Sequence, residues 1–354
     1  MSGPTVSNVL NGSGRVGEAA KARVLEAVAA LGYQPHHSAR SLRSRRTRQI
    51  GYVLPPVQLF PSNYIMQQFL QALAVASGRR GNSMVLVVQD QDPCGEMRRL
   101  VASRSVDAFV LSEMQPDDPR VALLAEAGMP FACFGRTGPG QPQYWVDIDN
   151  HAAVITAVEH VLARGFSRVA FAGYQSGHWD DERADGFRAG LARHGIPVGE
   201  ADVLLVDDAG ARRKIRSLLT GTHRGGRAGE RPDAIVTGSD RLAAHIYEVA
   251  AELRLRIGRD LGVTGFDGSM AAGLLHPRLT SVTIPVDDIA RRLVARVLRQ
   301  VDHGPDQSPG EVVEAPLRLG ESTGGKQRSS QAPDDRSVPE ENDNALVWRR
   351  LQGA

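Results

Sequence analysis

Cysteine is scarce in this chain, with two residues among 354. Cys94 and Cys133 do not form a C-x-x-C pair, so neither a disulfide framework nor a zinc finger is indicated, and both thiols are expected to be buried in a reducing compartment. No apolar run approaches the roughly 20 residues that span a bilayer. The N-terminus also lacks the features of a signal peptide. We therefore expect a cytoplasmic protein with no membrane partner.

Catalytic motifs are also missing from the sequence. No P-loop lysine pattern, H-E-x-x-H or G-x-S-x-G occurs. Gly12-x-Gly14-x-x-Gly17 formally matches the dinucleotide fingerprint, but it lies between two predicted helices instead of following a strand, and we interpret it as a turn. Adjacent His36 and His37 have no partners at metal-ligand spacing. We predict no enzyme activity, no cofactor and no metal site.

Charge is present but unevenly distributed. The whole chain has a net charge of +2, whereas residues 1–50 carry eight basic and two acidic side chains, a charge of +6, which leaves −4 for the remainder. A basic head on a mildly acidic body favours contact with a polyanion. A solvated basic tail would show the same charge, so this observation leaves both interpretations open.

Helical periodicity marks the head. Val6, Val9 and Leu10 fall on one face of a predicted helix over residues 4–11, which the Asn-Gly-Ser-Gly turn ends. A second helix is predicted over 18–31, with Gly32 as its stop. A short helix-compatible segment with basic side chains follows over 38–44.

From residue 50 onward, buried strands alternate with predicted helices, which is typical of a doubly wound parallel α/β architecture. Nine strands are more than a single sheet of this architecture usually contains, so we predict two sheets and hence two lobes. The expected strands are IGYVL (50–54), MVLVV (84–88), AFVL (108–111), FACF (131–134), VAFAG (169–173), VLLV (203–206), AIVTG (234–238), LGVTGF (261–266) and LTSVTI (279–284). An amphipathic helix over 286–301 and a last strand, VEAPLRL, precede a polar tail from about residue 321 that is expected to be disordered.

The motifs of the head and core together resemble the LacI (lactose repressor) family. The string PTVSNVLNG is followed by LGYQP, ARSL and IGYVLP, in the order of that family's recognition helix, third helix, hinge helix and first core strand. Further matching blocks are VDIDNHAA (146–153), HVLARGFSRVAFAG (160–173), ERADGFRAGL (182–191), DAIVTGSDRLAA (233–244), LGVTGFDG (261–268) and LLHPRLTSVTIPV (274–286). The resemblance covers residues 2 to about 323.

The resemblance implies a fold and a division into domains. The expected fold class is α/β, with a bilobal core like that of periplasmic binding proteins and a small all-α head. The expected domains are a partial helix-turn-helix over 1–36, a hinge helix over 37–48, a core over 49–320 and a tail over 321–354. Within the core, we expect an N-lobe of about 49–148 plus 282–309 and a C-lobe of about 149–281 plus 310–320.

The chain departs from the family pattern at its start. The family has a further helix before the recognition helix, and here Met1-Ser2 stands where the family reads Val-Ser. We expect that the first helix is absent because translation was assigned to an internal start, about 20 residues downstream of the true one. The alternative is a truncated, DNA-incompetent protein.

By resemblance, the helix at 3–10 enters the major groove of an operator. Gly3, Pro4, Ser7 and Asn8 would face the bases, and Thr5 would contact a phosphate and cap the helix. Asn can read adenine bidentately, whereas Gly and Pro offer shape and apolar contact. Around the hinge, Arg40 and Arg43 would contact phosphates. Leu42 would wedge into a minor-groove step and kink the duplex.

The resemblance also implies an effector site between the lobes, at the carboxyl ends of the strands. Asp240 and Asp267 follow predicted strands, and Arg183 and Arg136 would join them on ligand hydroxyls. Trp179 could stack on a sugar face. Tyr64 and Asp149 complete the expected set. For Asp240, an N-cap of the following helix is the alternative role.

The predicted function is a sequence-specific, DNA-binding transcription regulator of repressor type. It would act as a homodimer held by the N-lobe, with a sugar or sugar derivative as effector. A sugar-binding protein of the same fold that does not bind DNA is the alternative.

Overall fold

The computed structural model describes residues 3–10, 16–31, 46–54, 64–88, 92, 94–175, 178–207, 209–222, 231–306, 308 and 310–325. The head contains α1 (Gly3–Leu10) and α2 (Glu18–Leu31), which confirms both predicted helices. Val6 and Val9 of α1 are half-buried and Val24 of α2 is fully buried, so the two helices pack through their apolar faces. Of the predicted hinge helix, residues 37–45 lie outside the described residues, and 46–48 are described but not helical.

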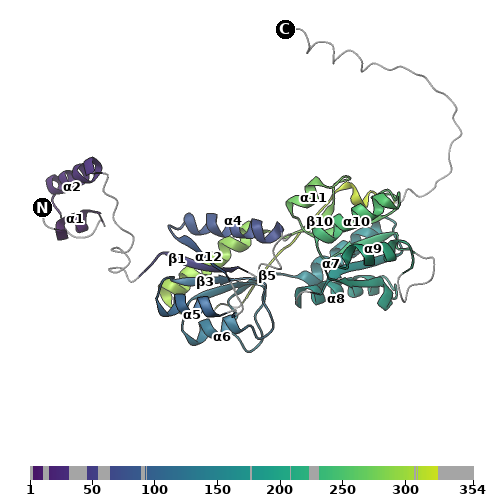
Figure 1. Cartoon of the computed structure of the whole chain (residues 1–354), viewed down its shortest axis with the longest axis horizontal. Helices are drawn as coiled ribbons and strands as arrows, with labels where there is room; N and C mark the ends of the chain where they lie inside the picture. Colours follow the sequence, from purple (N-terminus) through teal and green to yellow (C-terminus); the bar gives the residue numbers. More distant parts are fainter. Residues whose placement is uncertain are drawn as a thin grey trace, which may run out of the picture.

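The N-lobe is built on a six-stranded sheet with the order β11-β5-β4-β3-β1-β2. Its central strand β3 is buried at every residue, as expected where helices cover both faces of a parallel sheet. Figure 1 shows α4 and α12 on one face and α5 and α6 on the other. Its elements are β1 (Gln49–Leu54), α4 (Tyr64–Gly78), β2 (Ser83–Val88), α5 (Gly95–Ala102), β3 (Ala108–Leu111), α6 (Pro119–Glu126), β4 (Phe131–Phe134), β5 (Trp145–Ile148), α12 (Val286–His303) and β11 (Glu311–Val313).

The C-lobe repeats this plan with the order β12-β10-β9-β8-β6-β7. All its neighbouring strands are parallel except β12, which runs antiparallel to β10. Its elements are α7 (Asn150–Ala163), β6 (Val169–Tyr174), α8 (His178–Ala192), η2 (Glu200–Asp202), β7 (Val203–Val206), α9 (Ala211–Leu219), β8 (Ala234–Thr237), α10 (Asp240–Glu252), β9 (Gly262–Asp267), α11 (Met270–Leu274), β10 (Thr280–Thr283), β12 (Leu317–Arg318) and η3 (Glu321–Thr323).

The chain crosses between the lobes three times, at 148–150, 283–286 and 313–317. The predicted lobe boundaries were wrong at the last two crossings. Residues 282–283 finish β10 and belong to the C-lobe, whereas 311–313 form β11 in the N-lobe sheet. The predicted last strand is therefore two short strands in different sheets. The apolar pattern did not reveal this because the crossing itself contains Ala315 and Pro316 and reads as a continuation of the strand.

The predicted disordered tail also begins too early. Ser322 and Thr323 of η3 are buried against the C-lobe. The Ser322 hydroxyl donates to the Val263 carbonyl at 2.6 Å and accepts from the Thr280 NH at 2.8 Å. Residues 321–325 are therefore ordered through hydrogen bonds of polar side chains, which the apolar pattern does not reveal. The rest of the predicted tail lies outside the described residues.

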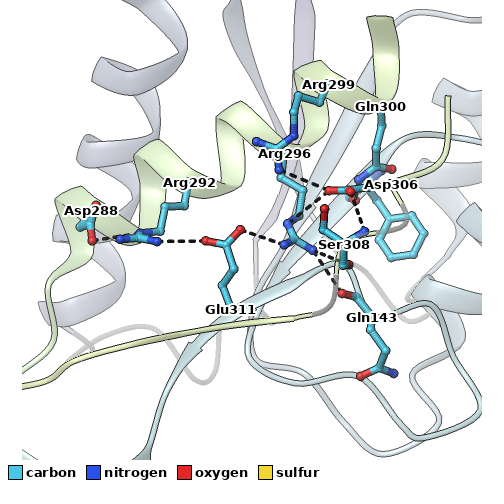
Figure 2. A network of polar contacts seen from close by, with 10 residues as sticks. Gln143, Asp288, Arg292, Arg296, Arg299, Gln300, Asp306, Ser308 and Glu311 are labelled. Atoms are coloured by element: carbon cyan, nitrogen blue, oxygen red, sulfur yellow. Dashed lines mark hydrogen bonds and ion pairs between the residues drawn. The ribbon is translucent and has the colours of Figure 1, made fainter. Parts of the chain in front are cut away.

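A charge network around the buried Arg296 fixes the return of the chain from α12 to β11 (Figure 2). Arg296 is fully buried; its Nη2 donates to Glu311 at 2.8 Å and its Nη1 to the Gln143 carbonyl at 3.2 Å. Arg292 donates to Glu311 at 3.0 Å and to Asp288 at 3.0 Å. Because these bonds join α12, β11 and the loop before β5, the N-lobe is stiffened beside the inter-lobe crossings.

The segment that enters the core is anchored at two places. Asp107 accepts hydrogen bonds from the backbone NH groups of Thr47 and Arg48, both at 2.7 Å. Arg46 donates to the Val301 carbonyl at 3.1 Å and pairs with Asp302 at the end of α12. The exit from the head is thus tied directly to the N-lobe. Within the described ranges, none of the helices combines the length and apolar surface that a bilayer crossing requires.

Candidate functional site

A cavity of about 850 Å³ lies between the lobes and is lined by both. Its walls include the carboxyl ends of β3, β4 and β5 in the N-lobe and of β6, β7, β8 and β9 in the C-lobe. This is the position at which open α/β sheets bind ligands. The volume lies in the range of small-molecule sites.

Arg183 of α8 forms the floor of the cavity. Its Nε donates to the Asn150 side chain at 2.9 Å, and its Nη1 donates to the Gly238 carbonyl at 2.7 Å. The guanidinium carbon lies 3.9 Å from the centroid of the Phe266 ring. These contacts fix the guanidinium of Arg183, which still lines the cavity. A positively charged donor of several hydrogen bonds is therefore held in place for a polar ligand.

Asp267 is the last residue of β9 and also lines the cavity. Burial, together with the nearby Asp240 carboxylate, raises its pKa well above the ordinary range, and Arg183 opposes this shift. Its φ of 112° lies in a region that side-chain-bearing residues rarely adopt. A strained backbone of this kind is typical of ligand sites.

Asp240 does not line the cavity, and its contact with the ligand stays a prediction. Its carboxylate accepts from the Ser269 NH and from the Ser281 hydroxyl, each at 2.6 Å. It is not the N-cap of α10 either, because Ser239 has that role. Burial raises the pKa of Asp240 to about 6. Asp240 instead holds the turn after β9, and so it supports the position of Asp267.

Arg136, at the end of β4, reaches across the cavity. Its Nη1 lies 3.6 Å from the Glu182 carboxylate on α8 of the other lobe, and its Nε lies 3.7 Å from Asp147 of β5. Glu182 also accepts from the Asn150 side chain at 3.2 Å and lies 3.6 Å from His178. A charge pair therefore links the lobes at the cavity, beside the crossing from β5 to α7.

Of the remaining predicted residues, Trp179 lines the cavity from α8, as proposed. Asp149 does not, because its exposed side chain caps α7 by accepting from the Ala152 NH at 2.8 Å. Its neighbours Asp147 and Asn150 line the cavity instead. Tyr64 begins α4, and its side chain is outside what the structure describes.

Sequence reasoning also missed other polar members of the lining, which include Glu113, Asp147, Asn150, Tyr174, Glu182 and Arg241. Burial raises the pKa of Asp147 to about 6 and that of Glu113 to about 7. Asn150 could have been found from its position in the VDIDNHAA block. Glu113 carried no such signal, since it follows a strand whose neighbours in the sheet were unknown.

The predicted DNA-contacting residues lie in α1 and the hinge. Thr5 and Asn8 are half-buried in α1, and nothing is described of the side chains of Gly3, Pro4 and Ser7. Arg40, Leu42 and Arg43 lie outside the described residues. Their roles stay predictions.

Comparison with known proteins agrees with this arrangement. Residues 1–36 match the family described as bacterial regulatory proteins, lacI family, and residues 158–323 match a periplasmic binding protein-like domain. The transcriptional regulator AglR of Rhizobium meliloti is 30% identical over 96% of this chain and 94% of its own length. CelR of Thermobifida fusca is 32% identical over 89% and 90%.

Solved structures show the same fold. The CelR–cellobiose complex has a TM-score of 0.69 at 28% identity, covering 90% of this chain and 95% of that one. A LacI-family regulatory protein from Chloroflexus aggregans has a TM-score of 0.70 at 26% identity, covering 78% and 98%. The lac repressor dimer bound to operator has a TM-score of 0.76 at 21% identity, covering 90% and 94%.

The head and the bilobal core define a DNA-binding transcription regulator and not an enzyme. The chain belongs to the LacI family of bacterial regulatory proteins.

Proposed function

We propose that this regulator is a repressor that binds its operator as a homodimer in the cytoplasm and is controlled by a sugar held in the inter-lobe cavity. The observation that carries the proposal is the fixed Arg183 fork beside Asp267 at the carboxyl ends of the C-lobe strands. Both groups form directional hydrogen bonds with vicinal hydroxyls, the group that sugars offer in quantity.

The rest of the lining supports a sugar. Trp179 and Tyr174 supply aromatic faces, on which the apolar face of a sugar ring can pack. The CelR relative was solved with cellobiose, which favours a carbohydrate for this chain as well. The effector contacts that we propose are those of Arg136, Trp179, Arg183 and Asp267, together with Tyr64 at the start of α4.

For the DNA contact, we propose that α1 lies in the major groove, with Gly3, Pro4, Ser7 and Asn8 toward the bases and Thr5 toward a phosphate. Arg40, Leu42 and Arg43 would contact the DNA at the hinge. The anchors at Arg46 and Asp107 support this proposal, because they connect the segment after the hinge to α12 and to the N-lobe sheet.

For the dimer, the surface around α4 and the edge strand β2 is the proposed contact. Val75 of α4 and Leu86 and Val88 of β2 are exposed. An apolar patch on an edge strand favours pairing with a second copy, because both the side chains and the free backbone groups of the strand can be covered there.

The test is a DNase footprint with the full-length protein on DNA flanking its own gene, with and without candidate sugars. We expect a protected site that competitor DNA does not remove. We expect Leu42→Ala to weaken that binding at least about tenfold, since it would remove the wedge that allows the bend, while sedimentation still shows a dimer. Ser44→Ala, in the same segment, is the matched control and should change binding less than about twofold.

Effector control is measured in the same assay. We expect one or more sugars to shift the footprint of the wild-type chain but not that of Asp267→Asn, which should still bind DNA. A chain that prefers no site on its own flanking DNA and ignores every sugar would contradict the proposal.

A further inference from the structure

The cavity is long compared with a single sugar ring. In the C-lobe sheet, strands β9, β8, β6 and β7 lie side by side in that order. The carboxyl end of each contributes to the lining, from Asp267 at the end of β9 to Asp207 just after β7. Since neighbouring strands are about 4.8 Å apart, these three steps span roughly 14 Å. One pyranose ring cannot touch Asp267 and Asp207 together.

A second set of polar side chains occupies the far end of this row. Tyr174 ends β6, Arg241 lies in the first turn of α10, and Asp207 follows β7. The Nε of Arg241 donates to the Tyr174 hydroxyl at 2.7 Å, and its guanidinium carbon lies 4.5 Å from the ring centroid. We call Tyr174, Arg241 and Asp207 the edge group. Its contacts hold a phenol ring and a guanidinium against each other in a fixed arrangement.

The edge group has the chemistry to bind a sugar independently of Arg183. Asp207 is exposed, and its Oδ1 accepts from the Gly210 NH at 2.6 Å. A carboxylate accepts hydroxyl hydrogen bonds on both oxygens, a guanidinium donates to ring and hydroxyl oxygens, and a tyrosine offers an apolar surface. All three line the same cavity as Arg183 and Asp267.

We propose that the effector has at least two linked sugar rings, the first held by Arg183 and Asp267 and the second held by the edge group. This inference rests on the proposed function, because it names the class of sugar that the same cavity takes. It assigns the edge group the role of selecting for chain length: a monosaccharide fills the first position only.

Calorimetry on the full-length protein tests the inference, with glucose and galactose against cellobiose, maltose and raffinose. We expect at least one of the last three to bind about tenfold or more tightly than either monosaccharide, since a second ring adds charge-assisted hydrogen bonds. Arg241→Gln should lower the affinity for that oligosaccharide about tenfold and change monosaccharide affinity less than about twofold. Arg213→Gln, on the exposed face of α9, is the matched control and should change neither affinity.

The outcomes are distinguishable. Equal affinity for a monosaccharide and its oligosaccharides overturns the inference and leaves the proposed sugar control intact. An equal loss for both kinds of sugar in Arg241→Gln, with an unchanged melting temperature, also overturns it. If no sugar binds and none changes the footprint, the proposed function itself fails, and the inference fails with it.

Discussion

Replacing Arg183 by methionine removes the charge from the floor of the cavity with little loss of side-chain volume. The wild-type guanidinium makes two hydrogen bonds, to Asn150 and to the Gly238 carbonyl, and lowers the pKa values of nearby carboxyl groups. Hydrogen bonds to charged groups contribute about 1.5–3 kcal/mol each. Loss of one member of a buried charge network costs about 3–5 kcal/mol. We expect Arg183→Met to lower the free energy of unfolding by about 3 kcal/mol or more.

The pH dependence of this loss is the sharper part of the prediction. Arg183 opposes the raised pKa of Asp267, Asp240, Asp147 and Glu113. Without the arginine, these carboxyl groups become harder to ionise in the folded protein, so their pKa values rise further. Carboxyl groups with raised pKa values favour the folded state when protonated and destabilise it once ionised. The deficit of the variant should therefore be larger at pH 8 than at pH 5.5.

Urea denaturation followed by circular dichroism, at both pH values, measures the effect. Arg188→Met is the control, because Arg188 lies on the same helix but is exposed and pairs with Asp185 on the surface. Its change should stay within about 0.5 kcal/mol. A wild-type urea midpoint for Arg183→Met, or a deficit equal at the two pH values, would refute the account of this site.

Two further predictions concern the wild-type titration and the packing of the C-lobe. Burial raises the pKa values of Asp147 and Asp240 to about 6 in the folded chain, above their ordinary 3.8. Each should therefore lose up to about 3 kcal/mol of its contribution to folding as the pH rises from about 4 to 6. In urea titrations, Asp147→Asn and Asp240→Asn should each flatten this dependence of stability on pH, and an unchanged dependence would contradict the prediction. A Cβ on Gly186 would lie 2.4 Å from the His151 carbonyl oxygen, so Gly186→Ala should push α7 and α8 apart. We expect the free energy of unfolding to fall by about 1–3 kcal/mol, with a lower melting temperature. Gly273→Ala, where a Cβ meets nothing within 4 Å, should be neutral or slightly stabilising, and equal effects of the two substitutions would exclude this explanation.

Local pattern was sufficient for most of the secondary structure. The apolar period of 18–31 predicted α2 with both of its ends, and runs such as AFVL predicted strands buried on both faces. The short strand β5 was missed because Asp147 interrupts its apolar run, and this residue is buried by the tertiary arrangement. The same physics explains why Asp149 was chosen in place of Asp147: both follow an apolar residue, and only the position of the sheet edge separates a cavity residue from a helix cap.

The residues of the cavity also divide into those that local sequence revealed and those that depend on the order of the strands. Arg183 and Asp267 could be selected from the sequence because each belongs to a block resembling the family. Arg136 could be selected because it follows a predicted strand, and Trp179 because it lies just before Arg183. The edge group could not, because it depends on β7 lying next to β6 at the border of the sheet. The contacts of Asp240 were also beyond the sequence, because chain position cannot tell whether a carboxylate turns to the cavity or to Ser269 and Ser281.

The sequence by itself determined the alternation of strands and helices, the two-lobed core and the family, because these depend on apolar periodicity and on local strings of residues. Only the tertiary structure decided which strand ends meet, where the chain crosses between the lobes, and that Arg136 of one lobe pairs with Glu182 of the other. The physical reason is that strand order in a parallel sheet is set by contacts between residues far apart in the chain, and no local pattern records those contacts.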